Sequence, residues 1–151
     1  ELLPRLEKLQ RLKPEQSAEV FLGKKGLKSA YEKLLANRTT KDEYIFLYIH
    51  EDEYAKESDL FYFSIQEMLK KMKTRGISNE NYKKSAFMKN ATYIDMRFVD
   101  FPIPGNFEVC GDRLLLISWK PIIAILIHSK SISDNFKEYF NTVWKRTKKE
   151  T

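Results

Sequence analysis

The hydrophobic residues of this chain are grouped in runs with two different spacings. Residues 114–119 and 122–127 form two nearly continuous apolar runs, separated by Lys120-Pro121. Because proline cannot continue a ladder of backbone hydrogen bonds, we expect two strands joined by a turn at this point. Neither run alternates with polar residues, which is typical of strands inside a sheet that is covered on both faces.

A helical spacing follows the second run. The apolar positions recur every three or four residues, at Ile132, Phe136, Phe140 and Val143. This spacing predicts an amphipathic helix that ends the domain. Ser131 and Asp134 have the spacing of a capping box at its start, and the lysines and arginine near its end suit the negative carboxyl end of a helix.

The first two thirds of the chain contain further strand and helix patterns. The elements predicted there are strands at 18–22, 42–51 and 93–99, helices at 27–35 and 58–72, and a brief helix within 79–90. Ser58 is the expected N-cap of the second helix, and Gly76 is expected just past its end. Gly111-Asp112 suits a tight hairpin turn before the two apolar strands.

This order of elements predicts an α/β sandwich with a mixed sheet. The sheet should be parallel where helices cross over and antiparallel where the last strands pair, with helices on both faces. We expect one domain at residues 17–149. Residues 1–12 carry leucines at a heptad-like spacing and read either as the tail of a linker and dimerisation helix or as a surface helix.

The composition is that of an ordinary globular chain. Its 151 residues are enough for one domain with a sizeable core. No apolar run approaches the roughly 20 residues that cross a bilayer, and no signal-peptide pattern begins the sequence. The single cysteine, Cys110, cannot form an intramolecular disulfide and is expected as a buried thiol. We therefore expect a cytoplasmic protein without membrane contact.

The net charge of +6 raises the question of nucleic acid. Lys70, Lys71, Lys73 and Arg75 form a modest basic cluster, and the C-terminal tail is also basic. These residues are the candidate contacts if the chain binds nucleic acid directly. Solvated helix faces and a solubilising tail are the other interpretation, because no aromatic residues are interleaved with the basic ones.

A polar cluster follows the second predicted strand, at the end of a strand where ligands gather in α/β sheets. His50, Glu51 and Asp52 form this cluster, and Asp95 and Arg97 lie on a neighbouring predicted strand. We expect these five residues to contact a small ligand. We expect no metal and no cofactor, because consecutive strand residues point to opposite faces and no second histidine has metal-ligand spacing.

Two other segments come close to known motifs. His128-Ser129-Lys130 resembles the start of the HxK(x)4D motif of phospholipase D-like enzymes, but the fifth residue after Lys130 is Asn135, and a second copy is absent. The chain is therefore expected not to be an enzyme, with a degenerate phosphodiesterase as the catalytic alternative. Gly23-Lys24-Lys25-Gly26 is neither a P-loop nor GxGxxG, so a tight turn between strand and helix is expected.

Several short motifs, taken in order, resemble the C-terminal effector domain of TrmB-type transcription regulators, a mainly archaeal group. The first is the leucine-rich start. The second is Gly23-Lys24-Lys25-Gly26-Leu27, which is similar to the family's GxxGI/L turn. The third is Lys73-Thr74-Arg75-Gly76-Ile77, which is similar to its "kkrGI" motif. The last is Gly111-Asp112-Arg113 together with segments 136–140 and 143–144, which are similar to the C-terminal ending of the family.

The resemblance implies a fold like one phospholipase D half without the catalytic motif. In that family a winged helix-turn-helix binds DNA, a coiled coil forms the dimer, and this domain senses an effector, which is a sugar in some members. It thus implies a regulatory, non-catalytic effector-binding domain, a homodimer through the N-terminal helix, and a sugar-like effector. This sequence has no winged helix, so DNA binding would need a preceding domain, and its first residue is Glu1 rather than methionine. No sugar-contacting residue can be transferred.

Overall fold

A seven-stranded sheet forms the centre of the computed structural model, which describes residues 16–148. The predicted helix at 1–12 lies outside these residues. The order of strands across the sheet is β1-β7-β6-β5-β2-β3-β4. Their bounds are β1 Ser17–Leu22, β2 Glu43–Tyr48, β3 Lys73–Asn79, β4 Ile94–Val99, β5 Asn106–Cys110, β6 Arg113–Trp119 and β7 Ile122–His128.

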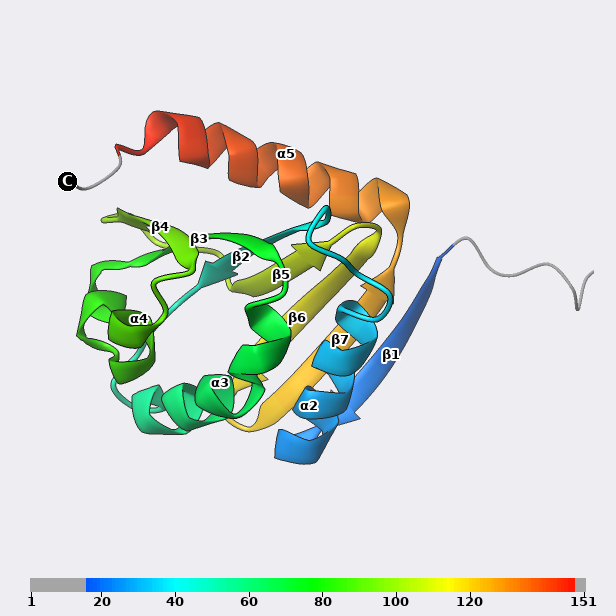
Figure 1. The fold of residues 1–151 in the computed structure, drawn as a ribbon, viewed down its shortest axis with the longest axis horizontal. Helices are drawn as coiled ribbons and strands as arrows, with labels where there is room; N and C mark the ends of the chain where they lie inside the picture. Colours follow the sequence, from blue (N-terminus) through cyan, green and yellow to red (C-terminus); the bar gives the residue numbers. More distant parts are fainter. Residues whose placement is uncertain (1–15, 149–151) are drawn as a thin grey trace, which may run out of the picture.

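Helices cover both faces of this sheet. Their bounds are α2 Gly23–Leu34, α3 Ala55–Leu69, the 3-10 helix η1 Glu80–Lys84, α4 Ala86–Asn90 and α5 Lys130–Arg146. Figure 1 shows α2, α3 and α4 on one side of the strands and α5 alone on the other. The predicted α/β sandwich is confirmed, and so are the short helical segments within residues 79–90.

The sheet is mixed in the predicted way. Strands β2, β3 and β4 run parallel, and β5, β6 and β7 pair antiparallel. The hairpin of β5 and β6 turns at Gly111-Asp112, where Gly111 has a φ of +63°, a conformation that glycine adopts without strain. These directions place the carboxyl ends of β1, β2, β3, β4 and β6 at one edge of the sheet, which we call the carboxyl edge.

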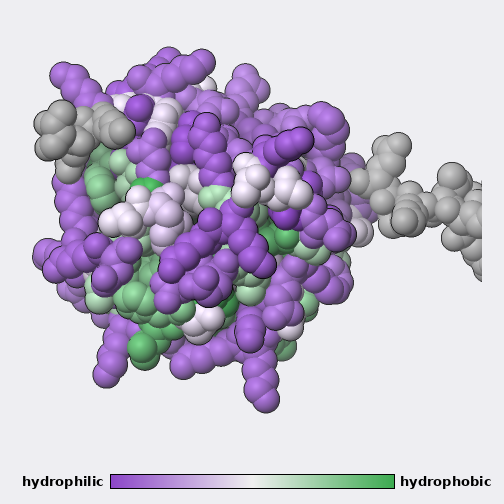
Figure 2. Space-filling view, viewed as in Figure 1, coloured by the Kyte–Doolittle hydropathy of each residue, from purple (hydrophilic) through white to green (hydrophobic). Residues whose placement is uncertain are grey.

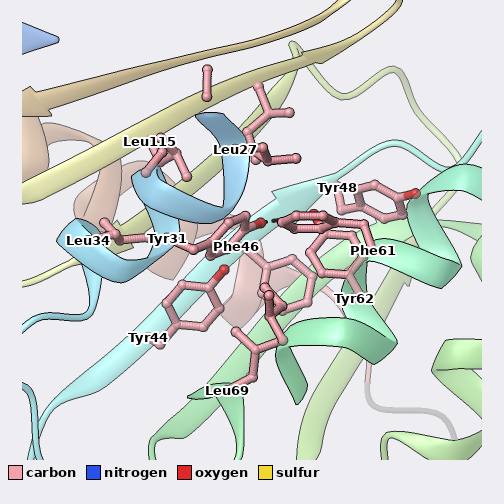
Figure 3. Close-up of a cluster of buried hydrophobic side chains, with 14 of the residues drawn as sticks. Leu27, Tyr31, Leu34, Tyr44, Phe46, Tyr48, Phe61, Tyr62, Leu69 and Leu115 are labelled. Carbon is pink, nitrogen blue, oxygen red and sulfur yellow. Dashed lines mark hydrogen bonds between the residues drawn. The ribbon is translucent and has the colours of Figure 1, made fainter. Parts of the chain in front are cut away.

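The larger hydrophobic core lies between the sheet and the helices α2, α3 and α4, and it is unusually aromatic. Figure 3 shows several of its rings. Its buried aromatic residues are Tyr31, Tyr44, Phe46, Tyr48, Tyr54, Phe61, Tyr62, Tyr82, Phe87 and Trp119. A smaller core lies under α5 and contains Phe140 and Trp144. The face of the molecule in Figure 2 is largely hydrophilic, with hydrophobic side chains visible in places between the polar ones.

The structure corrects the predicted bounds of the second helix. Ser58 lies inside α3, where it is fully buried. Its hydroxyl lies 2.6 Å from that of Tyr48, so Ser58 forms a hydrogen bond in the core and is not the N-cap of the helix. Gly76 is not past a helix end but in the middle of β3, between Phe46 and Met96. The helix predicted at 58–72 has the observed length but is placed three residues too late, and its last apolar residue, Met72, lies between α3 and β3.

The start of α5 also differs from the prediction. The N-cap is Ser129, whose hydroxyl accepts a hydrogen bond from the Ile132 backbone at 3.1 Å. Asp134 forms an ion pair with Lys130 rather than completing a capping box with Ser131. Cys110 is fully buried, as expected. Within residues 16–148, no helix is long and apolar enough to cross a membrane.

Candidate ligand-binding site

A single carboxylate lies in the middle of the aromatic core. Glu108 is only 3% exposed and is at the centre of β5, paired with Phe46 of β2 on one side and Leu115 of β6 on the other. All three side chains lie on the face of the sheet covered by α2 and α3, because paired residues of neighbouring strands point the same way. Glutamate is rarely buried to this degree unless it is paired.

Tyrosine hydroxyls from two helices hold one oxygen of this carboxylate. Tyr31 of α2 and Tyr62 of α3 both donate to Glu108 Oε1, the latter at 3.2 Å. The two hydroxyls also lie 3.0 Å from each other, as the dashed line in Figure 3 shows. The other oxygen, Oε2, has no hydrogen-bond partner among the described residues. A carboxylate can accept about four hydrogen bonds, so this one is incompletely satisfied.

Burial controls the charge of Glu108. It raises the pKa of the carboxyl to about 7, while the nearby hydroxyls of Tyr31, Tyr44 and Tyr62 act in the opposite direction because they favour the ionised form. Glu108 therefore changes its charge close to neutral pH, and within residues 16–148 no cationic side chain acts on it.

A narrow cavity of about 20 Å³, with room for about one water molecule, lies beside Glu108. It is lined by Tyr44, Phe46, Tyr48, Tyr62, Leu69, Thr74, Tyr82, Phe87, Ile94 and Glu108. Nine of these ten residues are buried, and Ile94 of β4 is the one that is partly exposed. Ile94 is therefore the lining residue with the most contact with solvent. Most of its lining is aromatic, as in pockets that bind small molecules.

Two of the other residues that line the pocket, Tyr48 and Thr74, have partners for their hydroxyl groups. The Tyr48 hydroxyl lies 3.0 Å from His50 Nδ1 and 2.6 Å from Ser58 Oγ. The Thr74 hydroxyl donates to the backbone oxygen of Met72 at 3.1 Å. Glu108 Oε2 is thus a hydrogen-bond acceptor that the protein leaves available at the pocket wall.

The structure places His50 behind this pocket rather than at an open site. The ring is buried, contacts Tyr48 and lies 5.1 Å from the Tyr82 ring, centroid to centroid. Burial lowers the pKa of His50, since it disfavours the charged ring. Its backbone is held by Asn79, which accepts from the His50 amide at 2.8 Å and donates to its oxygen at 2.9 Å. His50 therefore supports the pocket wall.

Of the other four predicted ligand contacts, only Asp52 is linked to His50, because the Asn81 amide donates to the His50 backbone oxygen and to Asp52 Oδ1, both at 3.1 Å. Glu51 and Asp52 are exposed in the loop at the carboxyl edge. Asp95 is exposed, and Arg97 lies 4.1 Å from the Trp144 ring and donates to the backbone oxygens of Trp144 and Thr147. Because side chains alternate along β4, Asp95 and Arg97 lie on the α5 face, whereas Ile94 lies on the pocket face. The five residues do not form one site.

The basic cluster proposed for nucleic acid is also divided. Arg75 is committed to the fold, because it forms two hydrogen bonds with Glu43, at 2.7 and 3.0 Å, and packs over the rings of Phe140 and Trp144. Lys70 lies 3.3 Å from a carboxylate oxygen of Glu67. The remaining pair, Lys71 and Lys73, is exposed.

The two histidines lie at opposite edges of the sheet. His50 follows β2 at the carboxyl edge, whereas His128 ends β7 in line with Tyr44, at the start of β2. His128 Nε2 lies 3.5 Å from Glu19 Oε2, and Lys130 Nζ lies 2.5 Å from Asp134 Oδ2. His128 and Lys130 therefore contact carboxylates far from His50.

The glycine turn and the acidic residues offer no additional site. Gly23 and Gly26 begin α2 directly after β1, as the expected tight turn, and Lys24 lies 3.5 Å from Glu57 of α3. In the described part of the chain, no group of three or more histidine, cysteine, aspartate or glutamate residues is placed to hold a metal.

Glu108 was not predicted from the sequence. It alternates with Phe107 and Val109, which is also the pattern of a strand with one solvated face. The available signal was indirect: a strand at the middle of a sheet covered on both faces buries every side chain. This signal requires the strand order, which local periodicity does not give.

Comparisons with known proteins concern the fold. No protein-family model and no curated protein matches this chain. Among solved structures, the phospholipase D family member Nuc from Salmonella typhimurium is similar with a TM-score of 0.61 and 11% identity, over 89% of this chain and 98% of that one. NucT from Helicobacter pylori is similar with a TM-score of 0.55 and 10% identity, over 89% and 99%.

TrmBL2, an archaeal chromatin protein whose structure shows a novel mode of DNA binding, is also similar. Its TM-score is 0.55 and its identity 15%, over 99% of this chain. This chain spans 60% of the length of TrmBL2. At these identities the likenesses establish the fold, which is phospholipase D-like.

Proposed function

We propose that this chain is a non-catalytic, regulatory domain that binds a small molecule beside Glu108, where the aromatic side chains move apart to admit more than one water molecule. The observation that carries this proposal is the Oε2 atom of Glu108, a buried acceptor without a partner at the wall of an aromatic pocket. Leaving such a group unsatisfied costs about 1–3 kcal/mol, so unsatisfied buried polar groups are uncommon and call for a specific reason. A ligand that donates to Oε2 supplies one.

The positions of the histidines support a non-catalytic role. Phosphoryl chemistry of the kind suggested by the HxK pattern needs a histidine nucleophile beside groups that bind phosphate. His128 and His50 lie at opposite edges of the sheet and cannot meet within one chain. Lys130 is paired with Asp134, one turn further along α5.

The regulatory part of the proposal rests on the resemblance to TrmB-type regulators and on a fold shared with TrmBL2. In this scheme the chain forms a homodimer through its N-terminal segment, and a winged-helix domain that precedes it contacts DNA. A ligand that prefers one arrangement of the dimer then shifts the population of that arrangement. The resemblance also implies a sugar-like effector.

Direct contact with nucleic acid is the second candidate function. It is favoured by the net charge of +6 and by the exposed Lys71 and Lys73. It is weakened by Arg75, which packs against α5 through Phe140 and Trp144 instead of facing solvent. We therefore place it behind ligand binding.

Closing the mouth of the pocket tests the proposal. Ile94→Trp places a larger side chain at the one partly exposed lining position. Ile125→Trp is a matched control, because Ile125 is also a partly exposed strand isoleucine but lies on β7, on the α5 side of the sheet. Chemical-shift changes on addition of neutral sugars, small alcohols and small amines should appear in the wild type and in Ile125→Trp, and should be lost in Ile94→Trp.

Two results would count against the proposed function. One is that no compound of any of these classes changes the spectrum of the wild type. The other is that Ile94→Trp and wild type bind the same compound equally well, which would place the binding site elsewhere.

A further inference from the structure

Strands β1 and β7 carry an apolar surface that no helix of residues 16–148 covers. Val20 and Leu22 of β1 are 64% and 68% exposed, and they pair with Ile125 and Ile123 of β7. Paired residues of neighbouring strands point the same way, so these four side chains and Ala18 lie on one face of the sheet. We call this set, Ala18, Val20, Leu22, Ile123 and Ile125, the β1–β7 patch.

The patch lies on the α5 face of the sheet but beyond α5 itself. Ile125 alternates with Ala124 and Leu126, which belong to the larger core on the opposite face. Helix α5 packs mainly against β2, β5 and β6 in the middle of the sheet, and Figure 1 shows β1 at the end of the sheet, beyond β7. The five patch residues are therefore left partly or wholly exposed.

Strand β1 also lacks features that commonly protect an edge strand from association. β7 is its one neighbour in the described sheet, so the outer backbone edge of β1 is unpaired there. Edge strands often carry lysine or proline, and Ser17–Leu22 contains neither. Its one charged residue, Glu19, points to the opposite face and forms an ion pair with Lys33 at 2.7 Å. An exposed apolar surface at such an edge is typical of an interface.

The absence of charge on the patch fits a second copy of the chain. None of the five patch residues is charged, and the β6 residues that continue the same face are Leu114, Leu116 and Ser118. Two copies with a net charge of +6 each repel one another over most of their surfaces. Contact through the patch places no like charges together, and a twofold axis allows the same surface to serve both copies.

The size of the patch indicates that it forms only part of an interface. A six-residue strand is about 20 Å long and neighbouring strands are about 5 Å apart, so two strands cover roughly 200 Å². A stable interface buries about 800 Å² on each partner, so further contact is needed. Residues 1–15 meet the domain beside the patch, because Gln16 directly precedes β1 and accepts a hydrogen bond from Ser129 at 2.8 Å.

We propose that the β1–β7 patch is an interface between two copies of this chain, continuous with the contact between their N-terminal segments. This inference rests on the homodimer of the proposed function and specifies the surface of the domain that takes part in it. The two patches face each other across a twofold axis, and each removes the apolar side chains of the other from water.

Sedimentation equilibrium of the full chain and its variants tests this inference. Leu22→Glu should raise the dissociation constant of the dimer about tenfold or more, because the contact would transfer an unpaired charge out of water. Val20→Glu should do the same and serves if Leu22→Glu, next to the start of α2, does not fold. Leu60→Glu is the matched control and should dimerise like the wild type. Leu60 is 60% exposed but belongs to α3, on the opposite face of the sheet.

The outcomes separate this inference from the proposed function. A wild-type dimer that neither Leu22→Glu nor Val20→Glu weakens, or that Leu60→Glu weakens equally, overturns the patch interface and leaves the homodimer to the N-terminal segments. A monomeric wild type contradicts both the patch interface and the homodimer. Neither result bears on ligand binding beside Glu108, which Ile94→Trp tests separately.

Discussion

At the scale of single residues, Glu108 is a carboxyl group buried in a core that otherwise favours apolar side chains. Its side chain is surrounded by aromatic residues, and its hydrogen bonds satisfy only one of two carboxylate oxygens. Replacing a buried charged group with an uncharged one of similar shape is often neutral or stabilising. Stability of the fold alone therefore does not explain a glutamate at this position, whereas recognition of a ligand does.

The raised pKa of Glu108 should make the stability of the fold depend on pH. Its pKa is about 7 in the folded protein and 4.5 in a solvated chain. Between pH 4.5 and 7 the folded state keeps the proton that the unfolded state releases, so the free energy of unfolding falls as pH rises through this window. From pH 4.5 to pH 8 the wild type should lose about 3 kcal/mol relative to Glu108→Gln, which does not titrate there.

Urea unfolding of the two proteins at both pH values measures this difference. Asp95→Asn is the control, since it makes the same change of acid to amide at an exposed position of β4. If the stability difference between wild type and Glu108→Gln were the same at pH 4.5 and pH 8, Glu108 would not titrate as the structure indicates.

At the scale of the elements, the sequence predicted most of the strands and helices, because their spacing is a local property. The two continuous apolar runs predicted β6 and β7, and apolar residues at every third or fourth position predicted α5. The boundary between α3 and β3 was wrong, because a glycine near a helix end is a common termination signal. Gly76 is required for a different reason, which involves a neighbouring strand.

Gly76 lies where β3 meets the ring of Phe46, a residue that also lines the pocket. A Cβ atom at Gly76 would overlap the end of this ring and lie 2.6 Å from Met96 Sδ. Because overpacking in a core typically costs 1–3 kcal/mol, we expect Gly76→Ala to lower the free energy of unfolding by about that amount. Chemical denaturation measures it.

Gly105→Ala is the comparison for this variant. Its Cβ would lie 3.2 Å from the tip of the Phe107 ring, which can move slightly. The effect on stability should be clearly smaller. If Gly76→Ala were as stable as the wild type, the close packing of β3 against Phe46 would be incorrect.

At the scale of the whole molecule, the strand order decides which residues meet, and the sequence does not reveal that order. The predicted set of His50, Asp95 and Arg97 is spread over two faces of the sheet, because residues of neighbouring strands share a site only if their alternation agrees. The pocket instead combines residues from β2, α3, β3, η1, α4, β4 and β5. Only the assembled fold brings these seven elements together.

The fold class itself followed from the order of strands and helices, and the structures of Nuc and TrmBL2 agree with it. The arrangement keeps His50 and His128 at opposite edges of the sheet and places Glu108 beside a cavity in the aromatic core. The central claim is therefore that this core contains a ligand pocket.

A crystal structure of the chain with the compound that binds most tightly tests this claim most directly. We expect density for the compound in the pocket between Tyr44, Tyr62 and Glu108, with a donor atom within about 3 Å of Oε2. A compound bound only at the outer surface, with water or repacked side chains filling the space beside Glu108, would contradict it.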